Sequence, residues 1–250
     1  MTCAPSAWKG ELDIFDGWAI WRGRVGDGTV HRHVAAQAVF APEGEAVVET
    51  VQGSRITDAC VLVEPLALHR LVRACEVELV FVEPWVSCWH VPMLCERRRQ
   101  ILTAARIADG SRPARFWPAL AQGVVDESRG APSPWMLAAG SRIDEQLAEG
   151  RVPLSALAQA LGLSNERARH LFAVEMGLPF KRYVLWRRLR LAAMHLRAGA
   201  GATASAHAAG FADAAHLART LKAMFGITAT QLRTGQDTRA ARNGSRSWAP

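Results

Sequence analysis

The segment from Leu154 to Gly226 predicts the fold of the C-terminal half, because it contains one local pattern twice. The first copy reads LSALAQALGLSNERARHLFAVEMG (154–177), and the second reads TASAHAAGFADAAHLARTLKAMFG (203–226). When Ser164 and Asp213 are aligned, apolar residues recur four, eight and twelve positions later in both copies, and a glycine follows at the thirteenth position. Spacing in steps of four places these residues on one face of a helix.

Each copy predicts a short Ala-rich helix, a turn that contains glycine, and a second amphipathic helix. Ser164 and Asp213 are suited to the start of the second helix, because their side chains can accept the free N–H groups of its first turn. Glycine supplies the backbone freedom that the bend requires. The pattern predicts two helix-turn-helix units, in which the second helix enters a DNA major groove.

The formal charge supports a nucleic-acid partner. Residues 1–133 contain 14 Lys and Arg against 16 Asp and Glu, whereas residues 134–236 contain 13 against 6. A basic balance confined to the repeated segment is what neutralisation of DNA phosphates requires. Taken without the repeat, the same charge would be equally consistent with a solvated helical surface.

Other features of the composition indicate where in the cell the protein acts. The chain lacks a run of about twenty apolar residues and a basic-then-apolar N-terminal segment, so we expect no membrane partner and a cytoplasmic location. Five cysteines without metal-finger or redox-pair spacing suit free thiols in a reducing compartment. They are Cys3, Cys60, Cys75, Cys88 and Cys95.

Residues 12–83 have the pattern of β structure. Short segments rich in β-branched and aromatic residues, such as WAIWRGRV (18–25) and VELVFVEPW (77–85), are separated by Gly, Pro and acidic residues. Strands at this close spacing predict a small antiparallel barrel or sandwich.

Histidines in this region suggest a ligand site. His31 and His33 are two apart, so both would point to one face of a strand, and His69 follows on a later segment. The arrangement resembles a cupin barrel, in which such a set can hold a metal, but Gln37 stands in the region where an acidic ligand is usual. We therefore assign no metal and expect the three histidines, Gln37 and Trp21 to line a small-molecule pocket. Trp18, Trp21, Trp85 and Trp89 could form an aromatic wall, although core filling is the commoner role.

The fold class predicted is α+β and multidomain. A cupin-like sensor barrel is expected at residues 1–91, a helical connector and hinge that could dimerise at 92–133, and an all-α domain with both helix-turn-helix units at 134–236. The connector helix is expected to include Leu94, Ile101 and Ala105. The segment LPFKRYVLWRRLRLAAMHL (178–196) predicts one long helix between the units, about 25 Å long. Residues 237–250 are expected to be a disordered tail.

These motifs resemble the AraC/XylS family of transcriptional regulators, over about 100 residues from Pro134 to Arg233. The most specific parts are LAQALGLS, GLPFKRYVLWRRLRLA and the second copy with its closing GFADAAHLARTLKAMFGIT. The resemblance implies a bacterial protein that binds promoter DNA and often responds to a small effector in an N-terminal cupin-like domain.

The resemblance also implies which residues meet DNA. In the first unit they are the cap and the exposed positions after it: Ser164, Asn165, Glu166, Arg167, Arg169 and His170. In the second they are Asp213, Ala214, Ala215, His216, Arg219 and Lys222. Arg, Asn and Glu can read base edges, whereas alanine can at most touch a thymine methyl. We therefore expect the first unit to discriminate bases and the second mainly to contact phosphates.

The function predicted is a sequence-specific transcriptional regulator, modulated by a small-molecule effector, with no catalytic residues and no cofactor. Its partners would be double-stranded promoter DNA, RNA polymerase if it activates, and a second copy if it dimerises. Two alternatives remain open: a metal-dependent cupin enzyme fused to a DNA-binding domain, and an architectural protein indifferent to DNA sequence.

Overall fold

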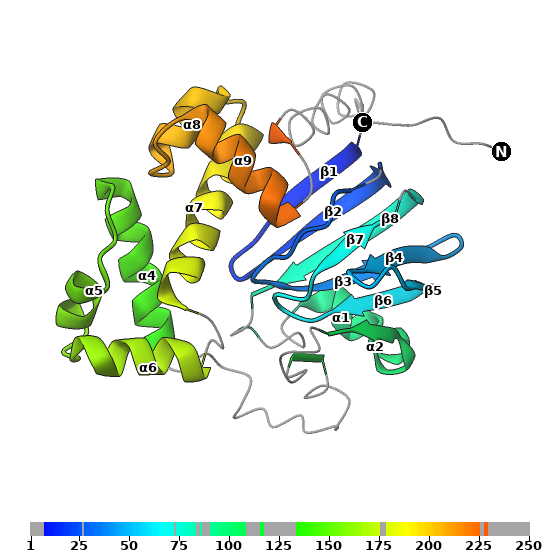
Figure 1. The fold of residues 1–250 in the computed structure, drawn as a ribbon, viewed down its shortest axis with the longest axis horizontal. Coiled ribbons are helices and arrows are strands. Elements are labelled where there is room, and N and C mark those ends of the chain that lie inside the picture. Colours follow the sequence, from blue (N-terminus) through cyan, green and yellow to red (C-terminus); the bar gives the residue numbers. More distant parts are fainter. Residues whose placement is uncertain are drawn as a thin grey trace, which may run out of the picture.

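The structure is a computed structural model, and it describes residues 8–26, 28–72, 74–83, 86, 91–108, 116–117, 134–175, 179–225 and 228–229. A β-rich N-terminal part lies beside a helical C-terminal part. Helices α7 (Phe180–Arg197) and α9 (Ala214–Phe225) occupy the side of the helical part that faces the sheet (Figure 1). Within these ranges, no helix has both the length and the apolar character needed to cross a membrane.

The larger sheet has six strands in the order β1-β2-β8-β3-β6-β9. All neighbours are antiparallel except β6 and β9, which run parallel. The strands are β1 (Lys9–Ile14), β2 (Trp18–Val25), β3 (Ala36–Phe40), β6 (Cys60–Val63), β8 (Ala74–Val82) and β9 (Ala105–Ile107).

A second sheet has three antiparallel strands in the order β5-β4-β7. They are β5 (Arg55–Asp58), β4 (Ala46–Thr50) and β7 (His69–Leu71). The strands that the structure describes therefore form two open sheets, and the closed barrel expected from the sequence is not seen among them. The β-rich character of the N-terminal part agrees with the expectation.

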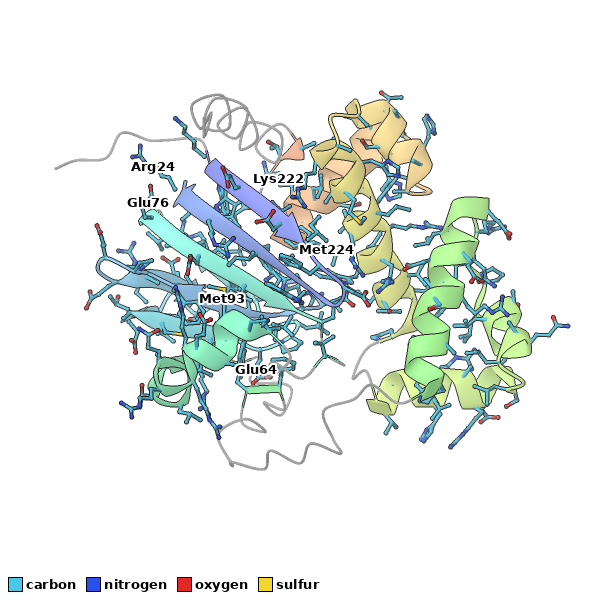
Figure 2. The ribbon with its side chains drawn as sticks, turned by 180° about the vertical axis from the view of Figure 1, so that it is seen from behind. Arg24, Glu64, Glu76, Met93, Lys222 and Met224 are labelled. Carbon is cyan, nitrogen blue, oxygen red and sulfur yellow. The ribbon has the colours of Figure 1, made fainter. Side chains whose placement is uncertain are left out.

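Successive side chains of a strand point to opposite faces of the sheet, and in the larger sheet both faces are apolar. On one face, Ala38 and Phe40 of β3 pack with Leu94 of helix α1 (Pro92–Glu96), Ile101 of helix α2 (Arg98–Thr103) and Trp117. These two helices cover that face in the view of Figure 2, where Met93 of α1 is labelled. The opposite face points toward the smaller sheet and the helical part, as the core that includes Val39 shows.

The connector departs from the helix expected there. Helix α2 ends at Thr103, and Ala105 belongs to strand β9, so the prediction of a helix through Ala105 is wrong. Parallel pairing with β6 supplies backbone hydrogen-bond partners for Ala105–Ile107 and buries the side chain of Ile107, which is 3% exposed. The Ala105 N–H also donates to Asp58 Oδ2 at 3.4 Å. Part of the segment 92–133 is thus built into the sheet, and residues 118–133 lie outside the described ranges.

The helical part follows the expectation closely. Its helices are α4 (Pro134–Glu149), α5 (Leu154–Ala160), α6 (Asn165–Glu175), α7 (Phe180–Arg197), α8 (Ala202–Ala208) and α9 (Ala214–Phe225). Helix α7 joins the two helix pairs α5/α6 and α8/α9. Its 18 residues correspond to a length of about 27 Å at 1.5 Å per residue.

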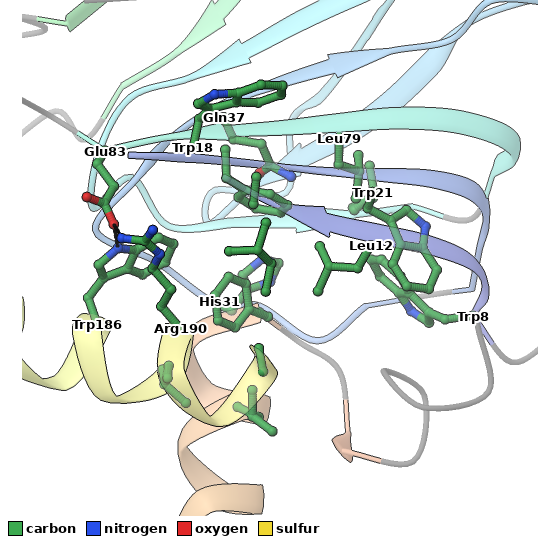
Figure 3. Close-up of a pocket in the computed structure, with 18 residues that line it drawn as sticks. Trp8, Leu12, Trp18, Trp21, His31, Gln37, Leu79, Glu83, Trp186 and Arg190 are labelled. Atoms are coloured by element: carbon green, nitrogen blue, oxygen red, sulfur yellow. Dashed lines mark hydrogen bonds and ion pairs between the residues drawn. The ribbon is translucent and has the colours of Figure 1, made fainter. Parts of the chain in front are cut away.

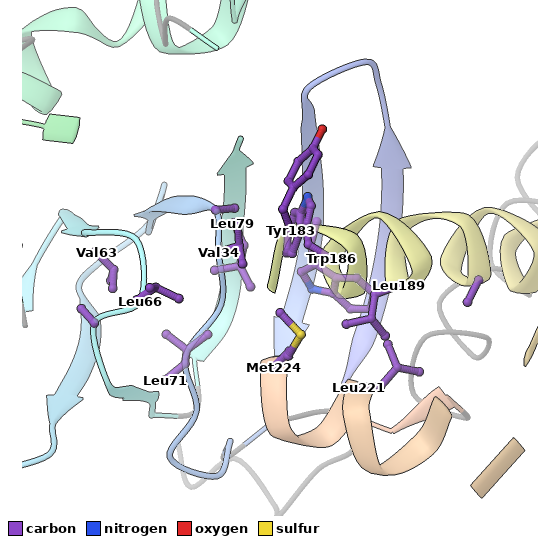
Figure 4. Packing of buried hydrophobic residues seen from close by; sticks show 14 of the residues in the cluster. Val34, Val63, Leu66, Leu71, Leu79, Tyr183, Trp186, Leu189, Leu221 and Met224 are labelled. Atoms are coloured by element: carbon purple, nitrogen blue, oxygen red, sulfur yellow. The ribbon is translucent and has the colours of Figure 1, made fainter. Parts of the chain in front are cut away.

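One apolar core continues from the sheet into the helical part. Trp186 and Leu189 of α7 pack with Leu221 and Met224 of α9, beside Leu79 of the sheet (Figure 4). All five side chains are buried, with at most 6% of their surface exposed. Helices α7 and α9 therefore carry contacts to the N-terminal part as well as contacts within the helical part.

Candidate nucleic-acid interface and ligand pocket

The two expected helix caps are present. The Arg167 N–H donates to Ser164 Oγ at 3.1 Å, and the His216 N–H donates to Asp213 Oδ1 at 2.6 Å. The hydrogen bond from the His216 backbone also holds the pKa of Asp213 below its usual value. Each side chain accepts one of the N–H groups that the first turn of a helix leaves unpaired, so the caps set where α6 and α9 begin.

The turns before the caps use glycine in the left-handed region of backbone space. Gly162 has a φ of 65° and Gly210 a φ of 73°, a conformation that favours glycine. The N–H of the following residue then closes each turn, from Leu163 to the Ala158 carbonyl at 2.8 Å and from Phe211 to that of Ala206 at 2.9 Å. The second turn is one residue longer than the first, since two residues separate Gly210 from its cap instead of one.

The apolar positions of both copies face inward. Ala168 and Phe172 of α6, and Leu217 and Leu221 of α9, are each no more than 1% exposed. Of the aligned positions further along, Met176, Gly177 and Gly226 lie outside the described residues. Phe225 is the exception to the symmetry, because it packs across the domain boundary against Phe81 and Trp186.

The faces opposite this core differ between the two units. In α6 all the predicted base-reading side chains are exposed: Asn165, Glu166, Arg167, Arg169 and His170. In α9, Ala215, Arg219 and Lys222 are exposed, whereas Ala214 and His216 are half-buried. The His216 ring packs edge-on against Phe211, with ring centroids 5.2 Å apart.

Part of the positive charge of the helical half is used inside the protein. Arg187 donates to Glu83 Oε2 at 3.4 Å and to Asp144 through two nitrogens. Arg197 Nη2 lies 2.8 Å from Asp13 Oδ1. Arg190 reaches the carbonyl of Phe15 at 2.9 Å, and Arg188 reaches that of Gly150 at 3.1 Å. The expectation that this charge serves DNA phosphates is therefore too broad for helix α7.

A pocket lies where the larger sheet meets α7 and α9. The cavity measures about 80 Å³, several times the roughly 10–15 Å³ that one water requires. Its lining is mainly apolar and aromatic, as is usual for sites that take small molecules. The aromatic members are Trp8, Trp18, Trp21, Phe81, Trp186 and Phe225, and several of them are labelled in Figure 3.

A few polar groups accompany this apolar lining. Glu83 Oε1 accepts a hydrogen bond of 2.8 Å from Trp186 Nε1, and the side chain of Arg190 lies nearby (Figure 3). Burial raises the pKa of Glu83, while Arg187 and Arg190 oppose that shift. Among the described residues, the buried indole N–H groups of Trp8 and Trp21 have no hydrogen-bond partner. Buried donors without partners are costly, so an acceptor atom supplied by a ligand would be favourable.

The structure brings the predicted ligand residues together at one place. His31, Gln37 and Trp21 line the pocket, and His33 and His69 lie immediately beside His31, with ring centroids 5.8 and 4.4 Å from its ring. Trp18 also lines the pocket, whereas Trp85 and Trp89 lie outside the described residues. All three histidines are buried, and burial lowers their pKa values, to about 4 for His33.

The residues that sequence reasoning missed come from the helical half. Trp186, Leu189, Arg190 and Ala193 of α7 line the pocket together with Phe225 of α9. Their spacing of three and four residues is that of one helix face, which is a detectable signal. The same spacing is equally consistent with packing inside the helical domain, so the pattern alone does not name the sheet as its partner.

Comparison with known proteins agrees with this architecture. Residues 157–235 match a family model described as a helix-turn-helix domain. Over 131 residues the chain is 32% identical to the transcriptional activator RhrA of Rhizobium meliloti. That alignment covers 50% of this chain and 41% of the relative, so the chain spans about two fifths of the relative that it matches.

A solved structure shows the same fold over most of the chain. ToxT from Vibrio cholerae is 9% identical, with a TM-score of 0.53 over 88% of this chain and 98% of that chain. At this identity the likeness concerns the fold alone, a β-rich N-terminal part followed by a helical part.

The two capped helix pairs have the arrangement of the helix-turn-helix class, which is also the class of the matched family model. Within that class, the matched domain and the activator relative make the chain similar to bacterial AraC-type regulators.

Proposed function

We propose that this regulator reads promoter DNA with α6 and α9 and that a small molecule in the interdomain pocket modulates the reading. The observation that carries the first part is the pair of caps, Ser164 and Asp213. They start two helices whose buried faces are equivalent and whose opposite faces carry exposed polar residues. Helix α7 would hold the two helices for successive major grooves, about 34 Å apart along the duplex.

Helices α6 and α9 would contribute unequally to base recognition. Asn165, Glu166 and Arg169 can form direct hydrogen bonds with base edges, and all are exposed. In α9 the half-buried His216 packs on Phe211, and the neighbouring alanines carry no donor or acceptor. Arg219 and Lys222 remain for phosphates, so α9 would chiefly set the register on the duplex.

The pocket supports modulation by a ligand, because it is lined from both halves. A molecule between the sheet and α7 would touch the helix that joins the two reading helices. The lining is apolar, and Trp8 and Trp21 offer two unpartnered indole donors. We infer an effector with an apolar body and an oxygen acceptor. ToxT has been solved with an unsaturated fatty acid bound, which is a molecule of that kind.

RhrA is named as an activator, and by that likeness we propose activation, with RNA polymerase as a partner at the promoter. A second copy of the chain would add a second pair of reading helices on the operator. The proposal requires no chemistry at the site, so it differs from the cupin-enzyme alternative.

The experiment that tests DNA reading is selection of bound fragments from a random duplex pool with the full-length protein at a stated salt concentration, since salt sets the non-specific background. We expect a motif with two blocks about one helical turn apart, and the first block should carry most of the base preference. Retention of fragments without an enriched motif, with and without added unsaturated fatty acid, would contradict the proposal and favour the architectural alternative.

A further inference from the structure

The three histidines beside the pocket form a converging set of ligand atoms. One ring nitrogen of each of His31, His33 and His69 lies within 4.8 Å of those of the other two. All three side chains are buried, with 5%, 1% and 1% of their surface exposed. The backbone holds two of them in register, since His31 and His69 exchange N–H···O hydrogen bonds of 2.9 and 3.0 Å.

Backbone carbonyls determine which nitrogen of each ring carries the proton. His31 Nδ1 lies 2.8 Å from the Thr29 carbonyl, and His33 Nδ1 lies 2.8 Å from that of Ala35. His69 Nδ1 lies 2.9 Å from the Ala67 carbonyl. A carbonyl only accepts, so each Nδ1 must donate, and each neutral ring keeps a lone pair on Nε2. Hydrogen bonds of this kind fix the tautomer and orientation of histidines that ligate metals.

The fourth group at the cluster makes an unusual contact. Gln37 Oε1 lies 3.1 Å from His33 Nε2 and 2.9 Å from His69 Nε2. With both Nδ1 atoms protonated, an amide oxygen would face two nitrogen lone pairs, which is a contact between acceptors. Two arrangements remove the conflict: a cation among the lone pairs, or an amide group turned so that its NH₂ donates to both rings.

We propose that His31, His33 and His69 bind one divalent transition-metal ion through Nε2, with the Gln37 amide oxygen as the adjacent donor. Three imidazoles and a neutral oxygen suit zinc, iron, cobalt or nickel and are a poor set for calcium or magnesium. Zinc–nitrogen distances of about 2.0–2.1 Å require the rings to move inward from their present separation. The sequence alone favours pocket lining, because it lacks the acidic ligand. The convergence of one nitrogen from each of the three rings is what changes that interpretation.

The neutral ligand set has a consequence for the pocket. Without a carboxylate ligand, the ion keeps its double positive charge in mostly apolar surroundings. His31 and Gln37 line the pocket, so an open coordination position of the ion would face a molecule bound there. An anionic oxygen of that molecule would then be the natural further ligand.

The ion would also lie next to the second reading helix. The ring of Phe225, the last residue of α9, stacks on the His33 ring with centroids 6.0 Å apart and an interplanar angle of 24°. An ion that fixes the orientation of His33 would therefore fix a contact surface for α9. The binding of the ion itself does not depend on DNA binding.

The test uses untagged full-length protein stripped with a chelator and then titrated with Zn²⁺ by calorimetry and with Co²⁺ by visible absorption. We expect one ion per chain, a higher unfolding temperature with Zn²⁺, and cobalt d–d bands. The variants His33→Ala and His69→Ala should lose the bound ion. His207→Ala is the matched control, because His207 is exposed on α8, and it should bind as the wild type does.

Variants at Gln37 test the site without removal of a histidine. Gln37→Leu should weaken Zn²⁺ binding by about 10–100-fold, the usual effect of altering a group next to the ligands. Gln37→Glu should tighten binding, because it supplies a carboxylate. Circular dichroism of the stripped variants checks that they fold. A wild-type protein that binds no stoichiometric ion would establish the turned amide and overturn the proposal, as would an ion that both His33→Ala and Gln37→Glu leave unchanged.

Discussion

Trp186 Nε1 donates a hydrogen bond of 2.8 Å to Glu83 Oε1, although 103 positions separate the two residues. Glu83 directly follows the last residue of strand β8, and Trp186 lies in the helix that joins the two helix pairs. Arg187 and Arg190 lie 3.4 and 3.8 Å from the same carboxylate. Glu83 is thus one of the points at which the N-terminal part is attached to α7.

Replacement of Glu83 by alanine should therefore destabilise the protein. Breaking a buried ion pair costs about 3–5 kcal/mol, and we expect the lower end because Asp144 still pairs with Arg187. The measurement is the free energy of unfolding in urea. Glu145→Ala is the control, because its pair with Arg142 is exposed and worth about 1 kcal/mol or less. Equal losses for the two variants would contradict a buried interdomain attachment.

Glu83→Gln should change how stability depends on pH. Burial raises the pKa of Glu83 above its ordinary 4.5, so folding favours the protonated form. The resulting contribution is fully present below the unfolded pKa and is lost as pH rises through the folded pKa. Glutamine can still accept from Trp186 but does not titrate. The stability of the variant relative to the wild type should therefore increase from pH 4 to neutral, in urea unfolding at a series of pH values. A constant difference would show that folding leaves the pKa of Glu83 unchanged.

Arg169→Ala should relax base preference at one operator position. Loss of a side chain that reads a base edge costs about 1–3 kcal/mol for the preferred sequence and much less for the others. The measurement is equilibrium binding to the selected operator and to its single-base variants at one salt concentration. Arg142→Ala, which removes an exposed arginine of α4, is the control. Uniform weakening on every duplex would reassign Arg169 to a phosphate contact.

Ser164→Ala should destabilise the first helix pair by about 1 kcal/mol, because it leaves the Arg167 N–H without its side-chain acceptor. Ser155 is an exposed serine inside α5, where alanine is the better helix former, so Ser155→Ala should be neutral or slightly stabilising. Urea unfolding of the two variants compares them directly. If both behave alike, the cap does not determine the start of α6.

Ala193→Phe should block the pocket, since Ala193 lines it from α7. An unsaturated fatty acid at about 100 times its dissociation constant would stabilise the wild type by about 2.7 kcal/mol, seen as a higher unfolding temperature. The variant should lose this shift. Ala138→Phe, on the exposed face of α4, should keep it. A shift that survives in Ala193→Phe would place the fatty acid elsewhere.

The helices of the C-terminal half could be predicted from the sequence, because the signals that define them are local. Ser164 and Asp213 start α6 and α9, and the apolar spacing defines their buried faces; each signal acts within a few residues. Strand segments such as 18–25 and 77–85 were also recognisable from composition. Strand β9 was not, since Ala105 to Ile107 suit a helix equally well until β6 offers them a partner.

The contacts between the two halves could not be predicted from the sequence and are known only from the folded structure. His31 and His69 meet because β7 returns beside the segment before β3, and no spacing rule predicts that pairing. Arg187, Arg190 and Arg197 resemble a DNA-facing basic stripe, yet they find Glu83, Asp16 and Asp13 in the other half. The apolar pattern of a helix face predicts that the face is buried, but it does not predict which element packs against it. The packing partner depends on the shape and charge of residues that lie a hundred or more positions away along the chain.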